Sequence, residues 1–191
     1  MKYISQLNYE HIPYYHNTDE GGIDGNVRKS GCGLCCVCMM LEHITVESLS
    51  IEECVKLSEE NGANHGRGTD MSILAPIIAE KFDLNYRKTD DLGEAIDHLK
   101  RGGHIIAHVV SKERGAEHGL FTNSGHYISL ISTDGKNFCI FDPSYREEKF
   151  STPERIGKLN AEHFPFLYCD AELVHGECAL DKPKYHLFSH K

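Results

Sequence analysis

Cys32, His126 and Asp142 are residue types that together perform nucleophilic catalysis, and their surroundings suggest that they meet. Cys32 stands between two glycines, directly before a run in which apolar residues from Leu34 to Ile44 recur at helical spacing. The glycines suit a turn in which the backbone must approach another group closely. We therefore expect Cys32 at or just before the N-terminus of a helix. Unpaired N–H groups and the helix dipole at that end favour the reactive thiolate.

The histidine and the aspartate are predicted to meet on a β-hairpin. Residues 125–132 and 137–141 read as two strands, and 133–135 as a three-residue loop that ends in a left-handed glycine. With that loop, His126 lies directly opposite Asp142 on one face, roughly 5 Å away at Cβ. A two-residue loop would put them on opposite faces, so the inference depends on the turn. The hairpin thus brings together a base and its orienting carboxylate.

A cysteine at a helix start with a later His–Asp pair is the Cys–His–Asx arrangement of thiol catalysis. Over residues 26–145 the sequence resembles the papain-like cysteine peptidases, in particular the bacterial branch related to the double-glycine leader peptidases that process bacteriocin precursors. The matching pieces are Gly31-Cys32-Gly33, Gly125-His126, Phe141-Asp142-Pro143 and the helix, glycine stop and strand pattern of residues 99–106. The resemblance implies a papain-like fold and a catalytic triad of Cys32, His126 and Asp142.

The resemblance also points to a side chain for the oxyanion hole. The family usually has a glutamine six residues before the cysteine, and here that position is Asn26. Its amide donor is the same but its side chain is one methylene shorter, so its loop must approach more closely. The alternative is that Asn26 is only a loop residue. Gln6 is the only glutamine in the chain, and it reaches the site only if the first thirty residues fold back.

The composition is that of one ordinary globular domain. The chain has 191 residues, of which 40% are hydrophobic and 26% are charged, and we expect a helical part at about 30–101 and a sheet part at about 104–174. The net charge of −9 argues against a nucleic-acid partner, because the phosphate backbone would be repelled. The N-terminus does not resemble a signal peptide, and no stretch has the length of a membrane span. The eight cysteines are therefore expected as reduced thiols in the cytoplasm.

The order of the remaining elements favours an α+β fold, with N-terminal helices packed on a C-terminal antiparallel sheet. Residues 1–29 read as an extended segment and a loop. Helices are predicted at 33–43, from a capping box at Ser50 to about 61, from 70 or 72 to 82 and at 92–101, with a further helix start at 152–154. Pro76 indicates either the later start or a kink. Strands are predicted at 84–87, 104–110 and within 164–174, and loops at 64–68 and 111–124.

Other classes of function compete with this interpretation. Cys32-x-x-Cys35 is also the spacing of a thiol–disulfide oxidoreductase, but no strand directly precedes it, and this class gives His126 and Asp142 no role. A zinc site is disfavoured because no second Cys-x-x-Cys or His-x-x-x-His pair occurs in a suitable place. Cys36 and Cys38 are expected to be structural.

The prediction from the sequence is a cysteine peptidase, or a related thiol acyl hydrolase or transferase. It acts on a peptide or amide substrate and needs no cofactor. A papain-like domain that only binds peptides is a further alternative, because Asn26 replaces the family's glutamine.

Overall fold

A seven-stranded antiparallel sheet forms the centre of the computed structural model, which describes residues 2–14, 25–65, 68–110, 119–180 and 183–191. The strand order is β3-β9-β4-β5-β6-β8-β7. The strands are β3 (Leu84–Thr89), β4 (His104–Val110), β5 (Gly125–Thr133), β6 (Asn137–Phe141), β7 (Asn160–His163), β8 (Phe166–Asp170) and β9 (Tyr185–His190). The sheet thus extends beyond the predicted 104–174, because β3 and β9 pair with each other and β9 with β4.

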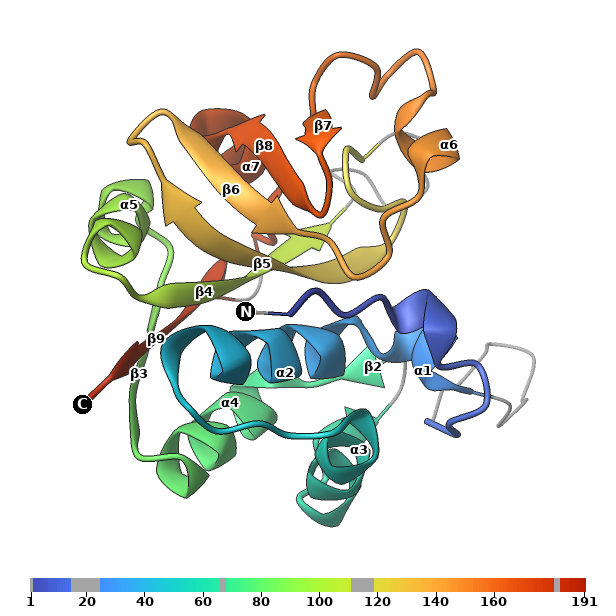
Figure 1. Ribbon diagram of the computed structural model, residues 1–191, viewed down its shortest axis with the longest axis vertical. Coiled ribbons are helices and arrows are strands. Elements are labelled where there is room, and N and C mark those ends of the chain that lie inside the picture. Colours follow the sequence, from blue (N-terminus) through green and yellow to red (C-terminus); the bar gives the residue numbers. More distant parts are fainter. Residues whose placement is uncertain (1, 15–24, 66–67, 111–118, 181–182) are drawn as a thin grey trace.

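Helices cover both faces of this sheet (Figure 1). The central helix α2 (Cys32–Ile44) packs on β4 and β5, and α3 (Ile51–Glu60) and α4 (Met71–Lys81) pack against it. On the other face lie α5 (Leu92–Lys100) and α7 (Ala171–Glu177). The short helices are the 3₁₀ helix η1 (Gln6–Asn8), α1 (Val27–Ser30) and α6 (Glu147–Phe150). Ile106 belongs to the hydrophobic cluster on the α2 side and Ile105 to the cluster on the α5 side, as alternate residues of one strand must.

The start of α2 is fixed by close packing at two glycines. A Cβ atom on Gly31 would lie 2.4 Å from Cγ1 of Val27, and one on Gly33 would lie 2.9 Å from Cβ of Thr69. A larger residue at either glycine would force Val27 or Thr69 to shift. The residues from Gly33 to Leu41 are all buried, because the sheet, the neighbouring helices and the N-terminal segment cover different sides of α2. This burial confirms that Cys36 and Cys38 are core residues.

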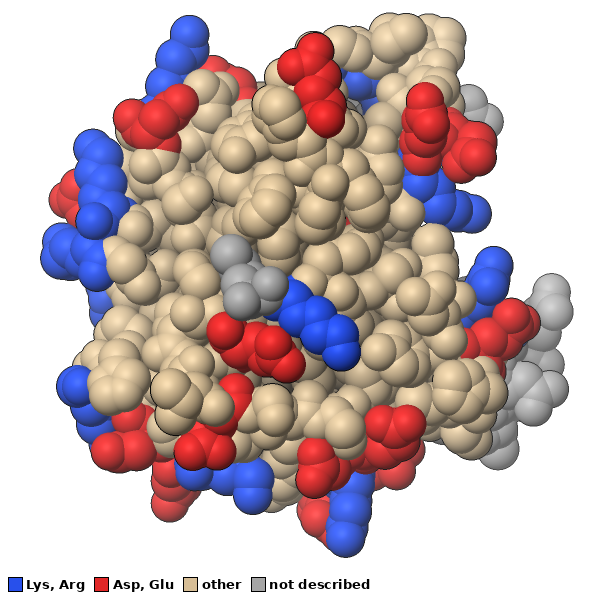
Figure 2. Space-filling model, viewed as in Figure 1, with Lys and Arg blue, Asp and Glu red and all other residues tan. Residues whose placement is uncertain are grey.

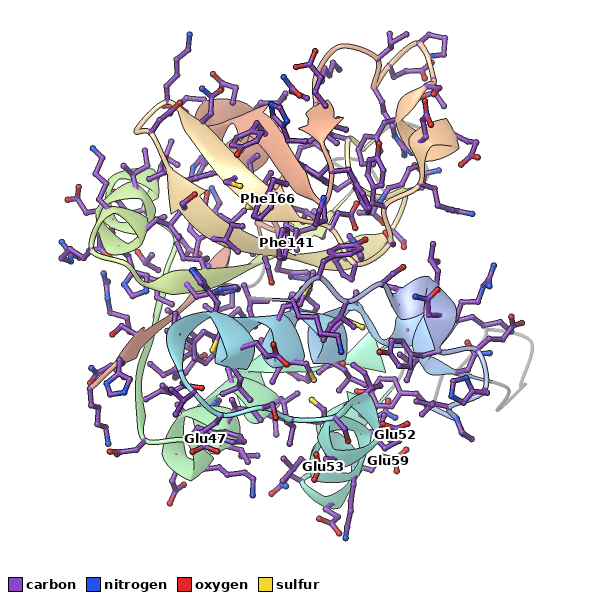
Figure 3. All side chains as sticks on the ribbon, in the orientation of Figure 1. Glu47, Glu52, Glu53, Glu59, Phe141 and Phe166 are labelled. Atoms are coloured by element: carbon purple, nitrogen blue, oxygen red, sulfur yellow. The ribbon has the colours of Figure 1, made fainter. Side chains whose placement is uncertain are left out.

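The N-terminal segment folds back between α2 and the end of β6 (Figure 1). The amide of Ile4 donates to Sδ of Met39 over 3.3 Å. The ring of Tyr3 packs edge-on against Phe141, with ring centroids 5.5 Å apart. The ring of Phe141 in turn packs against that of Phe166 of β8, with centroids 5.3 Å apart (Figure 3). The extended segment expected at the N-terminus is thus part of the core, while the predicted loop around residues 21–25 lies mostly outside the described residues.

Several predicted elements are confirmed and several are wrong. The capping box at Ser50 is present, and Asp91 caps α5 by accepting from the amide of Glu94. Helix α4 starts at Met71, between the two predicted starts, with Asp70 as its N-cap and Pro76 inside it. Within the loop predicted at 64–68, the two-residue strand β1 (Asn64–His65) pairs with β2 (Gly68–Thr69), and residues 66–67 lie outside the described part of the chain.

The C-terminal third differs most from the prediction. No helix starts at Thr152; its carbonyl accepts from two amides in an isolated turn, and the short helix α6 comes earlier. The sequence predicts a single strand within 164–174, but the chain forms strand β8 and then helix α7. The change comes at Asp170, which ends the strand and caps the helix by accepting from the amide of Leu173. Of the predicted loop at 111–124, residues 111–118 lie outside the described part of the chain.

Charged side chains of both signs are interspersed around the rim of the face in Figure 2. Acidic residues of α3 and the segment before it lie on the side away from the sheet (Figure 3): Glu47, Glu52, Glu53 and Glu59. Within the described ranges, no helix is both long and apolar enough to cross a membrane.

Buried histidines make the fold sensitive to acid. His104 is fully buried, with its Nδ1 2.9 Å from Nδ1 of His43, and His186 is buried beside Tyr86. Burial holds the pKa of His104 well below its usual value and, together with the nearby His108 and Lys88, lowers that of His186 to about 4. Both histidines are therefore neutral in the folded protein, whereas the unfolded chain binds protons near pH 6.5.

We expect the free energy of unfolding to fall as the pH decreases from about 6.5 toward 4, by about 1.4 kcal/mol per pH unit for each such histidine. Urea unfolding at pH 7.5, 6 and 5 measures this slope. His104→Leu should make the slope shallower, whereas His163→Leu, at an exposed position, should leave it unchanged. Equal slopes in all three proteins would contradict the assignment.

Candidate active site

Cys32 is the first residue of α2, with Gly31 as the N-cap. It is the only one of the eight cysteines that is partly exposed; the other seven are buried. Burial opposes ionisation of its sulfur, but the hydrogen bond and positive charge of His126 and the backbone of Tyr127 and Gly33 outweigh it and lower the pKa of Cys32. By contrast, burial raises the pKa of Cys35 well above its usual value. The reactive thiol is therefore expected at Cys32.

The β5–β6 hairpin brings His126 to Asp142, but not in the predicted register. Ser129 pairs with Phe141, Thr133 pairs with Phe138, and the register shifts between Leu130 and Ser132. Four residues, not three, separate the last pair, because the carboxylate of Asp134 accepts from the amides of Lys136 and Asn137. Gly135 does adopt the left-handed conformation, with φ at 94°.

The two side chains nevertheless touch, with His126 Nε2 2.7 Å from Asp142 Oδ1. The observed register differs from the predicted one by two residues, and an even shift keeps the same face of the sheet. Asp142 is therefore diagonal to His126 and not directly opposite. The prediction that they are neighbours is confirmed, and the prediction of a directly facing pair is wrong.

Asp142 is fully buried and has a second group of partners beyond His126. Its Oδ1 accepts from the amide and hydroxyl of Ser144 over 2.8 and 3.0 Å, and its Oδ2 accepts from Lys149 Nζ over 2.8 Å. Lys149 Nζ also donates to Ser144 Oγ over 2.9 Å. Sequence reasoning missed both residues. Ser144 follows directly in the Asp-Pro-Ser turn, but Lys149 arrives only through the fold of α6.

The electrostatics favour a charged imidazole next to a thiolate. Burial lowers the pKa of His126, but the charge of Asp142 and hydrogen bonds with Asp142 and Cys32 raise it to about 9. Burial alone would raise the pKa of Asp142, but the charges and hydrogen bonds of Lys149 and His126 outweigh it and hold the pKa of this carboxyl well below its usual range. Because Nε2 of His126 is engaged by Asp142, Nδ1 is the nitrogen that remains for the thiol.

Asn26 and Gln6, the two amide side chains considered for the oxyanion hole, have different surroundings. Asn26 is the N-cap of α1, and its Oδ1 accepts from the amide of Lys29 over 3.1 Å. Gln6 is buried. Its backbone amide donates to the carbonyl of Pro143 over 2.9 Å, and its side-chain Nε2 donates to the carbonyl of Arg28 over 2.8 Å. Gln6 is thus held between Pro143, the residue after Asp142, and α1, the short helix before Cys32. The first residues do fold back, as this candidate required.

Seven antiparallel strands, a central helix that begins at the cysteine and a His–Asp hairpin across from it define the papain-like cysteine peptidase fold. The described residues bring no three His, Cys, Asp or Glu side chains together as metal ligands.

Comparison with solved structures supports this fold. The peptidase domain of Streptococcus ComA, a bifunctional ABC transporter involved in quorum sensing, superposes with a TM-score of 0.54 at 14% identity, covering 95% of this chain and all of that domain. A putative C39-like peptidase from Bacillus anthracis gives a TM-score of 0.52 at 12% identity, covering 100% of this chain and 98% of that one. No protein-family model and no curated protein sequence matches the chain. These matches confirm the papain-like peptidase fold that the resemblance implies.

Proposed function

We propose that this protein is a cysteine peptidase, or a related thiol acyl hydrolase or transferase, acting on a peptide or amide substrate through Cys32, His126 and Asp142. The observation that carries the proposal is the arrangement at the start of α2. The single partly exposed cysteine stands at this helix start, His126 lowers its pKa, and Nε2 of His126 lies 2.7 Å from a buried carboxylate. This is the arrangement of nucleophile, base and orienting group.

In the proposed reaction, the Cys32 thiolate attacks the substrate carbonyl carbon, and the carbonyl electron pair moves to oxygen. The oxyanion is stabilised by the Cys32 amide and a side-chain amide. As the C–N bond breaks, the leaving amine takes the proton from His126 and leaves an acyl thioester. Water, or another amine or thiol in a transfer reaction, then gives a proton to His126, attacks the thioester and releases Cys32. Asp142 holds the imidazole throughout.

For the side-chain oxyanion donor we propose Gln6, with Asn26 as the competing candidate. The Oδ1 of Asn26 caps α1, and this contact fixes the side chain at the amide of Lys29. Gln6 is buried beside the turn that delivers Cys32, and one hydrogen of its Nε2 is used by the carbonyl of Arg28. An amide nitrogen carries two hydrogens, so the second can serve the oxyanion.

The oxidoreductase alternative is weakened by the fold. It requires a thioredoxin-like βαβ unit with a strand before the first cysteine, whereas the short helix α1 precedes Cys32. A domain that only binds peptides has the same fold, and reactivity of Cys32 separates it from an enzyme.

An iodoacetamide pulse at pH 6, with one equivalent of reagent and peptide mass spectrometry, tests the proposed nucleophile. We expect Cys32 to be alkylated well ahead of the seven buried cysteines, since its pKa is lowered while that of Cys35 is raised. The Cys32→Ala protein should be nearly unlabelled and should no longer cleave fluorescent casein. Even labelling of several cysteines, or preferential labelling of Cys35, would contradict the proposal.

Two further parts of the proposal concern setting and organisation. We propose that the protein works in the cytoplasm, because all eight cysteines are free thiols. We also propose that residues 1–191 act as one domain. The nucleophile comes from the helical side and the histidine from the sheet, and the N-terminal segment contacts both.

A further inference from the structure

Lys149 is the buried charge that the proposed mechanism leaves without a role. Only 9% of its side chain is exposed, and its ammonium lies 2.8 Å from Asp142 Oδ2. The other carboxylate oxygen, Oδ1, faces His126. One carboxylate thus stands between two cations, each on its own oxygen. A lysine in this environment is costly to bury unless it is paired.

The segment that carries Lys149 is anchored from both sides. The carbonyl of Lys149 accepts from Arg155 Nη1 over 3.0 Å. Arg155 is itself buried, and it also donates to the carbonyl of Gly119 over 2.9 Å and to the side chain of Asn123. These partners lie in the segment that leads into β5 and His126. The ammonium is therefore held in place by the same structure that places the histidine.

We infer that Lys149 is a positioning residue of the active site that sets the acidity of His126 through Asp142. Its charge offsets part of the field of the carboxylate, so the imidazolium is held less tightly than by an unpaired aspartate and gives its proton more readily to the leaving amine. Its hydrogen bond also fixes the carboxylate so that Oδ1 faces Nε2. This inference rests on the proposed function.

The other titratable groups around Asp142 do not supply this charge. On the N-terminal segment, Tyr3 donates its hydroxyl to the Asp142 carbonyl, and burial and Asp142 raise its pKa. Burial, Glu147 and Asp142 raise the pKa of Tyr145, and burial, Cys32 and Asp142 raise that of Cys36 on α2. All three groups are neutral near pH 7. Among the described residues that these contacts place around Asp142, the charged groups are therefore Lys149, His126 and the Cys32 thiolate.

The test uses Lys149→Gln, in which an amide still donates to Oδ2 but the charge is gone. The rate of Cys32 alkylation by iodoacetamide is measured from pH 4 to 11, together with thiolate absorbance. The lower step of the profile reports formation of the thiolate–imidazolium pair, and the upper step reports loss of the imidazolium proton. We expect the wild-type upper step near the His126 pKa of about 9. In Lys149→Gln it should move up by about 1 pH unit, as the loss of a nearby like charge requires.

Two further variants isolate the charge. Lys149→Arg keeps it and should restore the wild-type upper step. Lys158→Met removes a lysine from an exposed position in the same region and should leave the profile unchanged. An unshifted upper step in folded Lys149→Gln, or an equal shift in Lys158→Met, would overturn the inference. A wild-type protein that shows no alkylation step below pH 7 would instead overturn the proposed function.

Should Lys149→Gln fail to fold, Lys149→Met is measured in the same way, because it removes the charge while keeping a long side chain beside an intact Asp142. Its upper step should also lie about 1 pH unit above that of the wild type. An unshifted upper step in Lys149→Met would likewise overturn the inference.

Discussion

Replacing Gln6 with alanine should lower kcat by about 100- to 1000-fold, equivalent to roughly 3–4 kcal/mol of transition-state stabilisation. An oxyanion donor acts only as negative charge develops on the carbonyl oxygen, so KM should change little. Rapid alkylation of Cys32 at pH 6 should persist, because the thiolate depends on His126 and not on Gln6. Steady-state kinetics on a peptide identified from casein cleavage measure the loss.

Asn26→Ala is the matched control for this experiment. Its expected cost is the loss of the α1 cap, about 1 kcal/mol of stability, with kcat nearly unchanged. If instead Asn26→Ala loses the 100- to 1000-fold and Gln6→Ala keeps full activity, the donor is Asn26, as the position six residues before the cysteine suggests. Circular dichroism and thermal unfolding of both variants show whether a loss of rate is a loss of fold.

Asp142→Asn should destabilise the protein by about 3–5 kcal/mol, because it leaves Lys149 as a buried cation without a counter-charge. An asparagine side chain has nearly the shape of an aspartate and its carbonyl can still accept from His126, so the variant loses charge but no volume. Adding Lys149→Met should recover a large part of the stability, since the double variant buries no unpaired charge. Urea unfolding at pH 7 measures both steps.

The matched control is Asp97→Asn. Asp97 lies at an exposed position of α5, so we expect a change below about 0.5 kcal/mol. If Asp142→Asn were as mild as this control, the Asp142–Lys149 pair would not contribute the energy assigned to it.

The sequence by itself determined what is encoded locally. The glycines on either side of Cys32 and the apolar spacing after it place a helix start at the cysteine, and the structure begins α2 there. Alternating strands and a turn with a glycine placed His126 and Asp142 on one face. The exact pairing was wrong, because the irregularity between Leu130 and Ser132 and the four-residue loop shift the register. The contact survived because the shift is even and side chains alternate with a period of two.

Only the tertiary structure decided the parts that depend on distant segments. β9 joins β3 and β4 across the sheet, and the short runs of the C-terminal third have no periodicity that distinguishes strand from helix before they are packed. Gln6 is held near the site by two hydrogen bonds, from its backbone amide to the carbonyl of Pro143 and from its Nε2 to the carbonyl of Arg28. Lys149 is held by the hydrogen bond that Arg155 donates to its carbonyl. Neither placement leaves a local pattern, because each is a long-range contact between groups that any loop could carry. The residues proposed as nucleophile, base and orienting carboxylate were therefore readable from the chain, while those proposed to tune them were not.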